Sequence, residues 1–142
     1  MKYRKSAHAI YKTEYHLVWI PRYRRKVFVD GIKEYVEETI KHIPDIDPDI
    51  EAIRLNVQVD HVHAVIVIPP RISVADAIKF IKSQSSKQIR AKFPFFKKVY
   101  RGQAGIWSRG YCVSTVGIKE EEILRYVEYQ AKEDSGQLEL TL

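Results

Sequence analysis

Three features of the sequence predict an α+β fold built on one antiparallel sheet. Segments rich in β-branched and aromatic residues alternate with segments of helical periodicity. Their order places two neighbouring strand segments between two helices. No Gly/Ser linker, internal repeat or low-complexity segment divides the chain. Its 142 residues are close to the length of one domain, so we expect a single domain over residues 1–142.

The first half of the chain predicts a strand, a helix and a hairpin. Residues 13–20, TEYHLVWI, have the alternation of a strand, and the basic run over residues 21–26 follows as a loop. Asp30 can cap a helix over residues 31–43, whose apolar side chains share one face. Residues 50–68 have strand composition but are much longer than a usual strand of about 5–6 residues. We therefore expect a hairpin that turns near residues 58–60.

The second half predicts a helix, a strand and a last helix. Ser73, with Asp76 three residues later, predicts the capped start of a helix that runs to about Lys92. Residues 107–116 predict the fourth strand and residues 120–133 the last helix, followed by a short loose tail from about residue 134. The order β-α-β-β-α-β plus a C-terminal helix is typical of a ferredoxin-like (RRM-like) fold, with two helices on one face of the sheet.

Composition and charge narrow the class of protein. Hydrophobic residues make up 45% and charged residues 30%, as in globular proteins. Twenty-four Lys and Arg against 18 Asp and Glu give a net charge of +6, which favours polyanionic partners such as nucleic acid. The single cysteine, Cys112, excludes an intrachain disulfide and fits a reducing compartment. The longest apolar run, residues 64–68, is far shorter than the roughly 20 residues of a bilayer span. We expect a cytoplasmic protein without a membrane segment.

The segment Asp60-His61-Val62-His63 carries the sharpest local signal. Residues two apart on a strand point to the same face, so His61 and His63 are expected side by side. Two neutral imidazoles in this arrangement can bind one divalent metal ion. Taken alone, such a short pattern more often marks two ordinary polar residues.

Tyr126 and Gln130 form a second candidate pair on the last helix. They are four residues apart and therefore share one helical face. Turned toward the sheet, this face could present a phenol and an amide oxygen to a metal held by the two histidines. The alternative is that Tyr126 belongs to an apolar stripe with Ile123 and Val127, and that Gln130 is a surface residue.

Two groups of basic residues are candidates for DNA binding. One side of the second helix carries lysines, an arginine and hydroxyls without an acidic residue, as phosphate contacts require. The basic run after the first strand adds cations around a tyrosine that could stack on a base. A solvated helix face and a basic surface loop are the alternatives. The candidates are Arg22, Tyr23, Arg24, Arg25, Lys79, Lys82, Ser83, Ser86, Lys87 and Arg90.

Taken together, five segments resemble the single-tyrosine HUH transposases of small insertion sequences, the TnpA-type family. They are YHLVWIPRYRRKVF, DHVHAVIVIPP, IKSQSSKQIR, WSRGYCVSTVG and RYVEYQ, and they span about residues 15–130. By this resemblance His61 and His63 match metal ligands, Tyr126 the nucleophile and Gln130 the third ligand. Asp60 matches a common family residue, and whether it orients His61 or only makes the turn stays open.

The resemblance implies a DNA transposase that cleaves and rejoins the single-stranded ends of an insertion sequence through a 5′-phosphotyrosine intermediate. It further implies recognition of hairpins at the element ends, a divalent metal (Mg²⁺ or Mn²⁺), and a homodimer with active sites shared between subunits. Neutral ligands would leave the full charge of the metal to act on the phosphate. Two alternatives are another HUH nuclease and a non-catalytic or domesticated single-stranded nucleic-acid-binding protein on the same fold.

Overall fold

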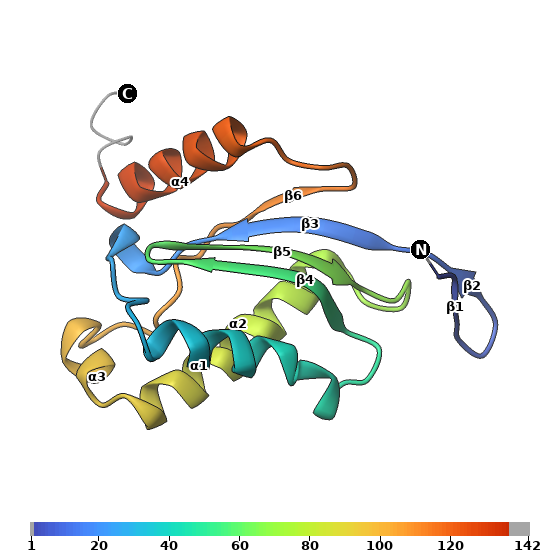
Figure 1. Ribbon diagram of the computed structural model, residues 1–142, viewed down its shortest axis with the longest axis horizontal. Helices are drawn as coiled ribbons and strands as arrows, with labels where there is room; N and C mark the ends of the chain where they lie inside the picture. Colours follow the sequence, from blue (N-terminus) through green and yellow to red (C-terminus); the bar gives the residue numbers. More distant parts are fainter. Residues whose placement is uncertain (1, 137–142) are drawn as a thin grey trace.

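The computed structural model describes residues 2–136 and has the predicted α+β architecture (Figure 1). In chain order the elements are β1 (Arg4–Lys5), β2 (Ile10–Tyr11), β3 (Glu14–Trp19), η1 (Arg22–Arg24), α1 (Ile32–Lys41), η2 (Ile43–Asp45), β4 (Glu51–Gln58), β5 (His61–Val67), α2 (Val74–Lys92), α3 (Phe95–Val99), β6 (Cys112–Ser114) and α4 (Glu120–Asp134). In the described part of the chain, no helix is long and apolar enough to cross a membrane.

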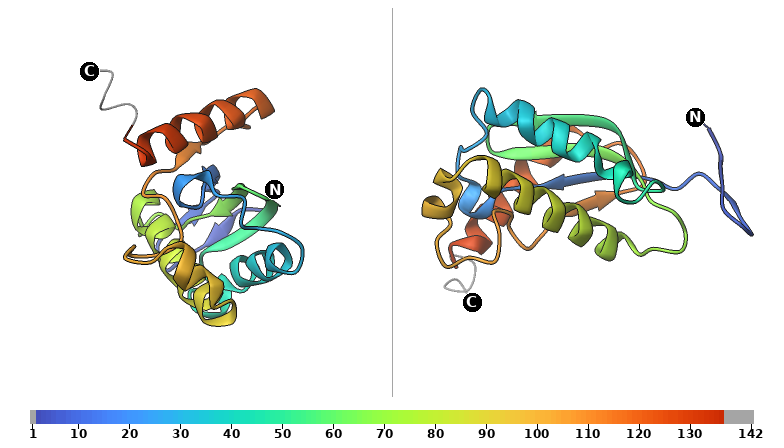
Figure 2. Two further views of the ribbon diagram at one scale, coloured as in Figure 1. Left: turned by 90° about the vertical axis from the view of Figure 1, so that its left-hand side faces the viewer. Right: turned by 90° about the horizontal axis from the view of Figure 1, so that it is seen from below.

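The main sheet has the strand order β4-β5-β3-β6, and each neighbouring pair is antiparallel. This is the strand order of the ferredoxin-like fold, as predicted. Helices α1 and α2 lie on one face of the sheet, and α4 lies on the other (Figures 1 and 2). Strands β1 and β2 form a separate hairpin that projects from one end of the molecule (Figure 2).

The main core lies between the sheet and helices α1 and α2. Alternate side chains of the two central strands enter it and meet isoleucines and valines of both helices. These strand residues are almost fully buried: Leu17, Trp19, Val62, Ala64 and Ile66. A strand between two other strands, with one face in the core, has little freedom to change register.

A smaller cluster lies on the opposite face and holds α4 against the sheet. Val18 and Ile20 of the β3 segment pack there against Ile123 and Val127. Residues of β5 that alternate with the core residues point to this same face, because side chains along a strand alternate. The odd-numbered positions of β5, including both histidines, therefore lie on the α4 side of the sheet.

The start of α2 has the cap expected from the sequence, and the start of α1 has a different one. The Ser73 hydroxyl accepts a hydrogen bond from the Asp76 backbone N–H at 3.0 Å, as predicted for α2. Gly31, and not Asp30, is the N-cap of α1, where its φ of +87° is accessible to glycine. The Gly31 N–H donates to the Glu34 carboxylate at 2.5 Å, which stabilises the first turn.

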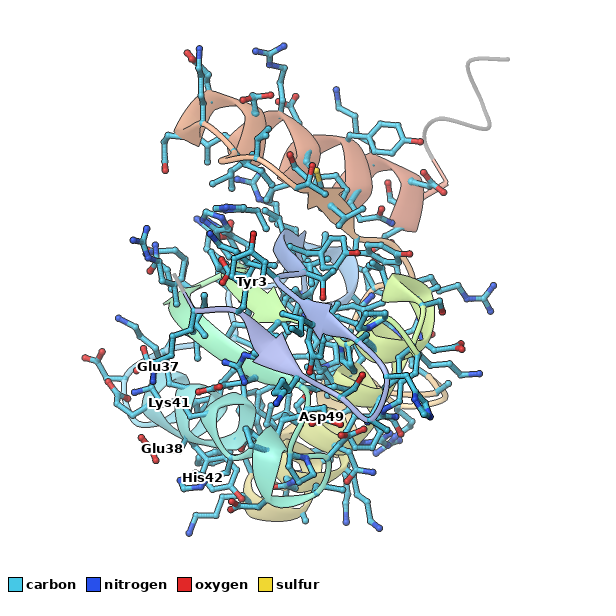
Figure 3. All side chains as sticks on the ribbon, turned by 90° about the vertical axis from the view of Figure 1, so that its right-hand side faces the viewer. Tyr3, Glu37, Glu38, Lys41, His42 and Asp49 are labelled. Atoms are coloured by element: carbon cyan, nitrogen blue, oxygen red, sulfur yellow. The ribbon has the colours of Figure 1, made fainter. Side chains whose placement is uncertain are left out.

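Figure 3 shows the outer face of α1, where Glu37, Glu38, Lys41 and His42 point away from the sheet. His42 is exposed and lies 3.3 Å from the Glu38 carboxylate. This mixed acidic and basic face is a solvated helix surface and does not attract polyanions.

Three connecting segments differ from the sequence-based expectation. The strand expected over residues 107–116 is shortened to Cys112–Ser114, because Trp107 turns into the core and forms only an isolated bridge with Pro21. The basic run is not a plain loop, since residues 22–24 form a 3-10 turn with left-handed backbone at Tyr23 and Arg24. The short elements β1, β2 and α3 were not predicted, because two to five residues carry no readable periodicity.

The chain also stays helical further than expected at its C-terminal end. Asp134, expected to begin the loose tail, is the last residue of α4 and accepts hydrogen bonds from other elements. Residues 137–142 of the expected tail lie outside the described residues.

The small size of the α4 cluster generates the first prediction. Val127→Ala removes a fully buried side chain from this cluster and should lower the local opening free energy of α4 by about 2 kcal/mol. Hydrogen exchange should show faster exchange of α4 amides, with β5 unchanged. Leu124→Ala, at a 45% exposed position of the same helix, is the control and should change little. Equal loss of protection in β5 would contradict the separate docking of α4.

Candidate active site

His61 and His63 lie at the start of the central strand β5, on the α4 side of the sheet. Val62 and Ala64, which alternate with them, belong to the main core on the other side. In the β-sheet register His63 pairs with Val18 of β3 and with Asn56 of β4. The two imidazoles are therefore held by a strand that is hydrogen-bonded on both sides, which is a rigid support for a ligand pair.

Asp60 both forms the turn before β5 and orients His61. Its Oδ1 lies 2.9 Å from His61 Nδ1, and its Oδ2 accepts a hydrogen bond of 2.9 Å from Arg24 Nε. Burial favours the neutral acid, but the hydrogen bonds from His61 and Arg24 outweigh it and lower the pKa of Asp60. An ionised Asp60 accepts a hydrogen bond from Nδ1–H of His61, and this tautomer of the imidazole has its lone pair on Nε2. Carboxylates support metal-binding histidines in this way.

His63 has a buried ring nitrogen that no protein group satisfies. Among the described residues, its Nε2 has no hydrogen-bond partner. Burial lowers the pKa of His63, and the nearby charges of His16 and His61 lower it further, against an opposing effect of Glu120. The ring is therefore neutral at pH 7. A buried, unpaired imidazole nitrogen costs free energy that a bound metal ion would recover.

A third imidazole, His16 of β3, was not identified from the sequence. Its ring centroid lies 6.0 Å from that of His63, and its Nδ1 is also buried without a partner in the described chain. Both rings line a cavity of about 300 Å³ beside Asn56. Only the β3–β5 register brings His16 to His63, and no sequence spacing indicates that register.

Tyr126 and Gln130 point toward the interior and are joined to each other. The Tyr126 hydroxyl donates to Gln130 Oε1 at 3.3 Å, and Gln130 is only 5% exposed. Burial raises the pKa of Tyr126, and nearby Cys112 and Asp134 raise it further. The phenol is therefore fully protonated at neutral pH and needs activation before it can act as a nucleophile.

Asp134 connects this pair to the rest of the fold. Its Oδ1 accepts hydrogen bonds from Gln130 Nε2 at 3.0 Å and from the Ser108 hydroxyl at 2.7 Å. Its Oδ2 accepts the backbone N–H of Tyr23 at 2.9 Å. One carboxylate thus fixes the end of α4 to η1 and to the segment before β6, and it orients the Gln130 amide.

The structure does not join the two predicted pairs within one chain. In residues 2–136, no hydrogen bond links Tyr126 or Gln130 to either His61 or His63. Over the same residues, no group of three or more His, Cys, Asp or Glu side chains is arranged to hold a metal. The His61 and His63 nitrogens suit a divalent cation in chemistry, and a third protein ligand would be an amide oxygen such as that of Gln130.

Some of the predicted DNA-binding residues form hydrogen bonds within the protein, and others are exposed to solvent. Arg24 bonds to Asp60, Arg22 Nε donates to the Gly105 carbonyl at 3.1 Å, and Lys82 Nζ donates to the carbonyls of Ser108 and Gly110 at 2.8 Å. Ser86 is buried, against the expectation of an outward-facing arc, and accepts the Ile106 N–H. The exposed members of the α2 group are Lys79, Ser83 and Lys87.

The close fit of Gln130 against Gly110 generates the second prediction. A Cβ at Gly110 would lie 2.1 Å from Gln130 Oε1, so Gly110→Ala must displace the amide. The clash involves the end of a flexible side chain, so we expect the fold to survive. The side-chain amide resonances of Gln130 should shift strongly in NMR spectra. Gly117→Ala, where nothing lies within 4 Å, is the control, and an unchanged Gln130 signal would contradict this packing.

Comparison with known proteins agrees with this architecture. The family model described as "Transposase IS200 like" matches residues 9–130. The transposase for insertion sequence element IS200 of Salmonella typhimurium is 30% identical over 128 residues, covering 90% of this chain and 83% of the relative. The ISDra2 transposase TnpA of Deinococcus radiodurans is 28% identical over 131 residues, covering 92% of each.

Two solved structures share the fold. A crystal structure from Deinococcus radiodurans R1, of a protein assigned as a transposase, has a TM-score of 0.76 and 29% identity, and the match covers 89% of this chain and 97% of that one. A REP-associated tyrosine transposase bound to a REP hairpin has a TM-score of 0.52 and 14% identity, covering 94% and 74%. The second likeness shows the fold alone. The match of the family model over residues 9–130 shows that the chain belongs to the IS200-like transposase family.

Proposed function

We propose that this transposase cleaves and rejoins single-stranded DNA at the ends of an insertion sequence, with Tyr126 as the nucleophile. The observation that carries the proposal is the pair of histidines on β5, one oriented by Asp60 and the other with a buried, unpaired nitrogen. Family membership supports a DNA-processing activity, and the cytoplasm is the expected location.

The proposed reaction is a transesterification at one phosphodiester of the DNA strand. Tyr126 Oη attacks the scissile phosphorus, and a new Tyr–O–P bond forms as the bond to the 3′-oxygen breaks. The phenol proton ends on that oxygen, which leaves a 5′-phosphotyrosine and a free 3′-hydroxyl. Attack by a 3′-hydroxyl in reverse rejoins strands without ATP, because the phosphodiester is conserved.

Each site residue of this chain would have a separate function in the reaction. His61, His63 and Gln130 would hold Mg²⁺ or Mn²⁺, which when bound polarises the phosphate and stabilises the leaving oxygen. Asp60 keeps His61 in the tautomer that presents Nε2. Burial raises the pKa of Tyr126, so the phenol has to lose its proton to the metal-bound site or to a nearby base as it attacks.

We also propose a homodimer in which Tyr126 and Gln130 complete a site with the partner's His61 and the partner's His63. Within residues 2–136 of one chain, Tyr126 bonds to Gln130 and Gln130 bonds to Asp134, and neither bonds to the histidines. β6 is an edge strand of the sheet, and an edge strand can pair with another chain. The hairpin-bound neighbour supports hairpins at the element ends as ligands.

Tyr126→Phe should lower the rate of DNA cleavage at least about a thousandfold, because it removes the nucleophilic oxygen. Labelled single strands from the DNA flanking this gene, incubated with Mg²⁺ or Mn²⁺, would show the covalent product on a denaturing gel. Hairpin binding should remain within a few-fold. Tyr129→Phe is the matched control, since Tyr129 is 51% exposed on the same helix. Cleavage by Tyr126→Phe, with loss in Tyr129→Phe, would show that the nucleophile is assigned wrongly.

Asp60→Asn should weaken binding of Mn²⁺ about 10–100-fold, because it removes the carboxylate that orients His61. Electron paramagnetic resonance of free Mn²⁺ would measure the affinity without DNA, and His61→Ala should weaken it further and stop metal-dependent cleavage. Asp45→Asn, at an exposed position near His42, is the control. Wild-type Mn²⁺ affinity in both Asp60→Asn and His61→Ala would remove the argument for a metal site on β5.

A further inference from the structure

A cavity lies outside the histidine and tyrosine pairs, between α2 and residues 104–111. Its volume is about 600 Å³, within the usual range for small-molecule sites. Ala75, Ile78 and Trp107 supply apolar lining. The cavity is therefore large enough and apolar enough for a planar organic group.

The charged groups that line this cavity all have the same sign. Five cationic side chains line it and, among the described residues, no carboxylate does: the cations are Arg22, Lys79, Lys82, Lys87 and Arg109. None of the five makes a salt bridge within residues 2–136, and of the five only Arg22 and Lys82 donate side-chain hydrogen bonds to carbonyls there. An uncompensated positive lining selects an anionic ligand.

The wall of the cavity is fixed before any ligand binds. Ser86 Oγ accepts the Ile106 N–H at 3.1 Å, the Trp107 indole donates to the Ser85 hydroxyl at 2.9 Å, and Lys82 holds two backbone carbonyls. Gly105 approaches α2 so closely that a Cβ would lie 3.0 Å from Ser86 Oγ. Burial lowers the pKa of Lys82 to about 8, as expected for a lysine held inside the wall.

This cavity shares two lining residues with the surroundings of Gln130. Arg22 and Arg109 line it and also line a second cavity of about 260 Å³, whose other walls include Gln130 and Asp134. Arg22 and Arg109 could therefore contact phosphates of a strand that passes from the smaller cavity beside Gln130 to the larger one.

We infer that the cavity between α2 and residues 104–111 binds one unpaired nucleotide of a single DNA strand, with the base against the apolar lining. Lys79, Lys87 and Arg109 contact its phosphate and that of its neighbour. The inference rests on the proposed single-strand activity for the identity of the ligand. It adds to that activity a discrete site that recognises a base, beyond the general attraction of basic residues for DNA.

Ala75→Trp tests the inference, because Ala75 lines the cavity and a larger side chain there takes up part of its volume while every cation is kept. Ala91→Trp is the matched control, since Ala91 is also exposed on α2 but does not line the cavity. The probes are an oligothymidylate of about 16 nucleotides and an abasic strand with the same number of phosphates. Binding is measured by fluorescence anisotropy in EDTA, so no cleavage step contributes, and thermal melting confirms that both variants fold.

The wild type and Ala91→Trp should bind oligothymidylate at least about fivefold more tightly than the abasic strand, as one stacked base provides. In Ala75→Trp this ratio should fall by about fivefold, with the abasic affinity unchanged. An unchanged ratio in Ala75→Trp would overturn the inference, and so would equal weakening for both probes, which would indicate a phosphate site. Because the readout needs neither metal nor Tyr126, failure of the cleavage proposal would leave this result intact, and the reverse also holds.

Discussion

The alternation of side chains along β5 is the constraint on which the rest of the structure depends. Val62, Ala64 and Ile66 on one face are almost fully buried in the main core. A shift of the strand by one residue would place these apolar groups under α4 and the histidines in the core. The free energy of the core therefore fixes the direction of His61 and His63. The positions of candidate ligands follow from packing that has no part in the chemistry.

The second organising interaction is the set of hydrogen bonds to the carboxylate of Asp134, which adds polar contacts to the apolar packing of α4. The apolar contact between α4 and the sheet involves only four buried residues, whereas Asp134 accepts hydrogen bonds from two other segments and from Gln130 of its own helix. A helix attached by a small apolar cluster and a few polar contacts can open more easily than the sheet. The arrangement keeps the Gln130 amide and the Tyr126 phenol oriented on a helix that has few apolar contacts with the sheet.

Much of the fold could be predicted from periodicity and caps. The β3 alternation, the hairpin turn before His61 and the Ser73 cap all depend on contacts between residues close in sequence. The end of the fourth strand could not be predicted, because Trp107 leaves the strand pattern to donate its indole N–H to Ser85, 22 residues away. His16 could not be identified for the same reason, because its approach to His63 depends on strand register between residues far apart in sequence. The functions of Arg24 and Lys82 inside the fold were hidden for the same reason, since nothing local distinguishes them from free basic residues.

Peptide mapping of the covalent DNA adduct would test the central claim, that Tyr126 carries the strand, most directly. Trypsin cleaves after Arg125 and Lys132, so one peptide over residues 126–132 contains both Tyr126 and Tyr129. After nuclease digestion, fragment-ion mass spectrometry locates the remaining nucleotide on this peptide. The account predicts a nucleotide joined through its 5′-phosphate to Tyr126. A nucleotide on Tyr129, or on any residue outside this peptide, would contradict it.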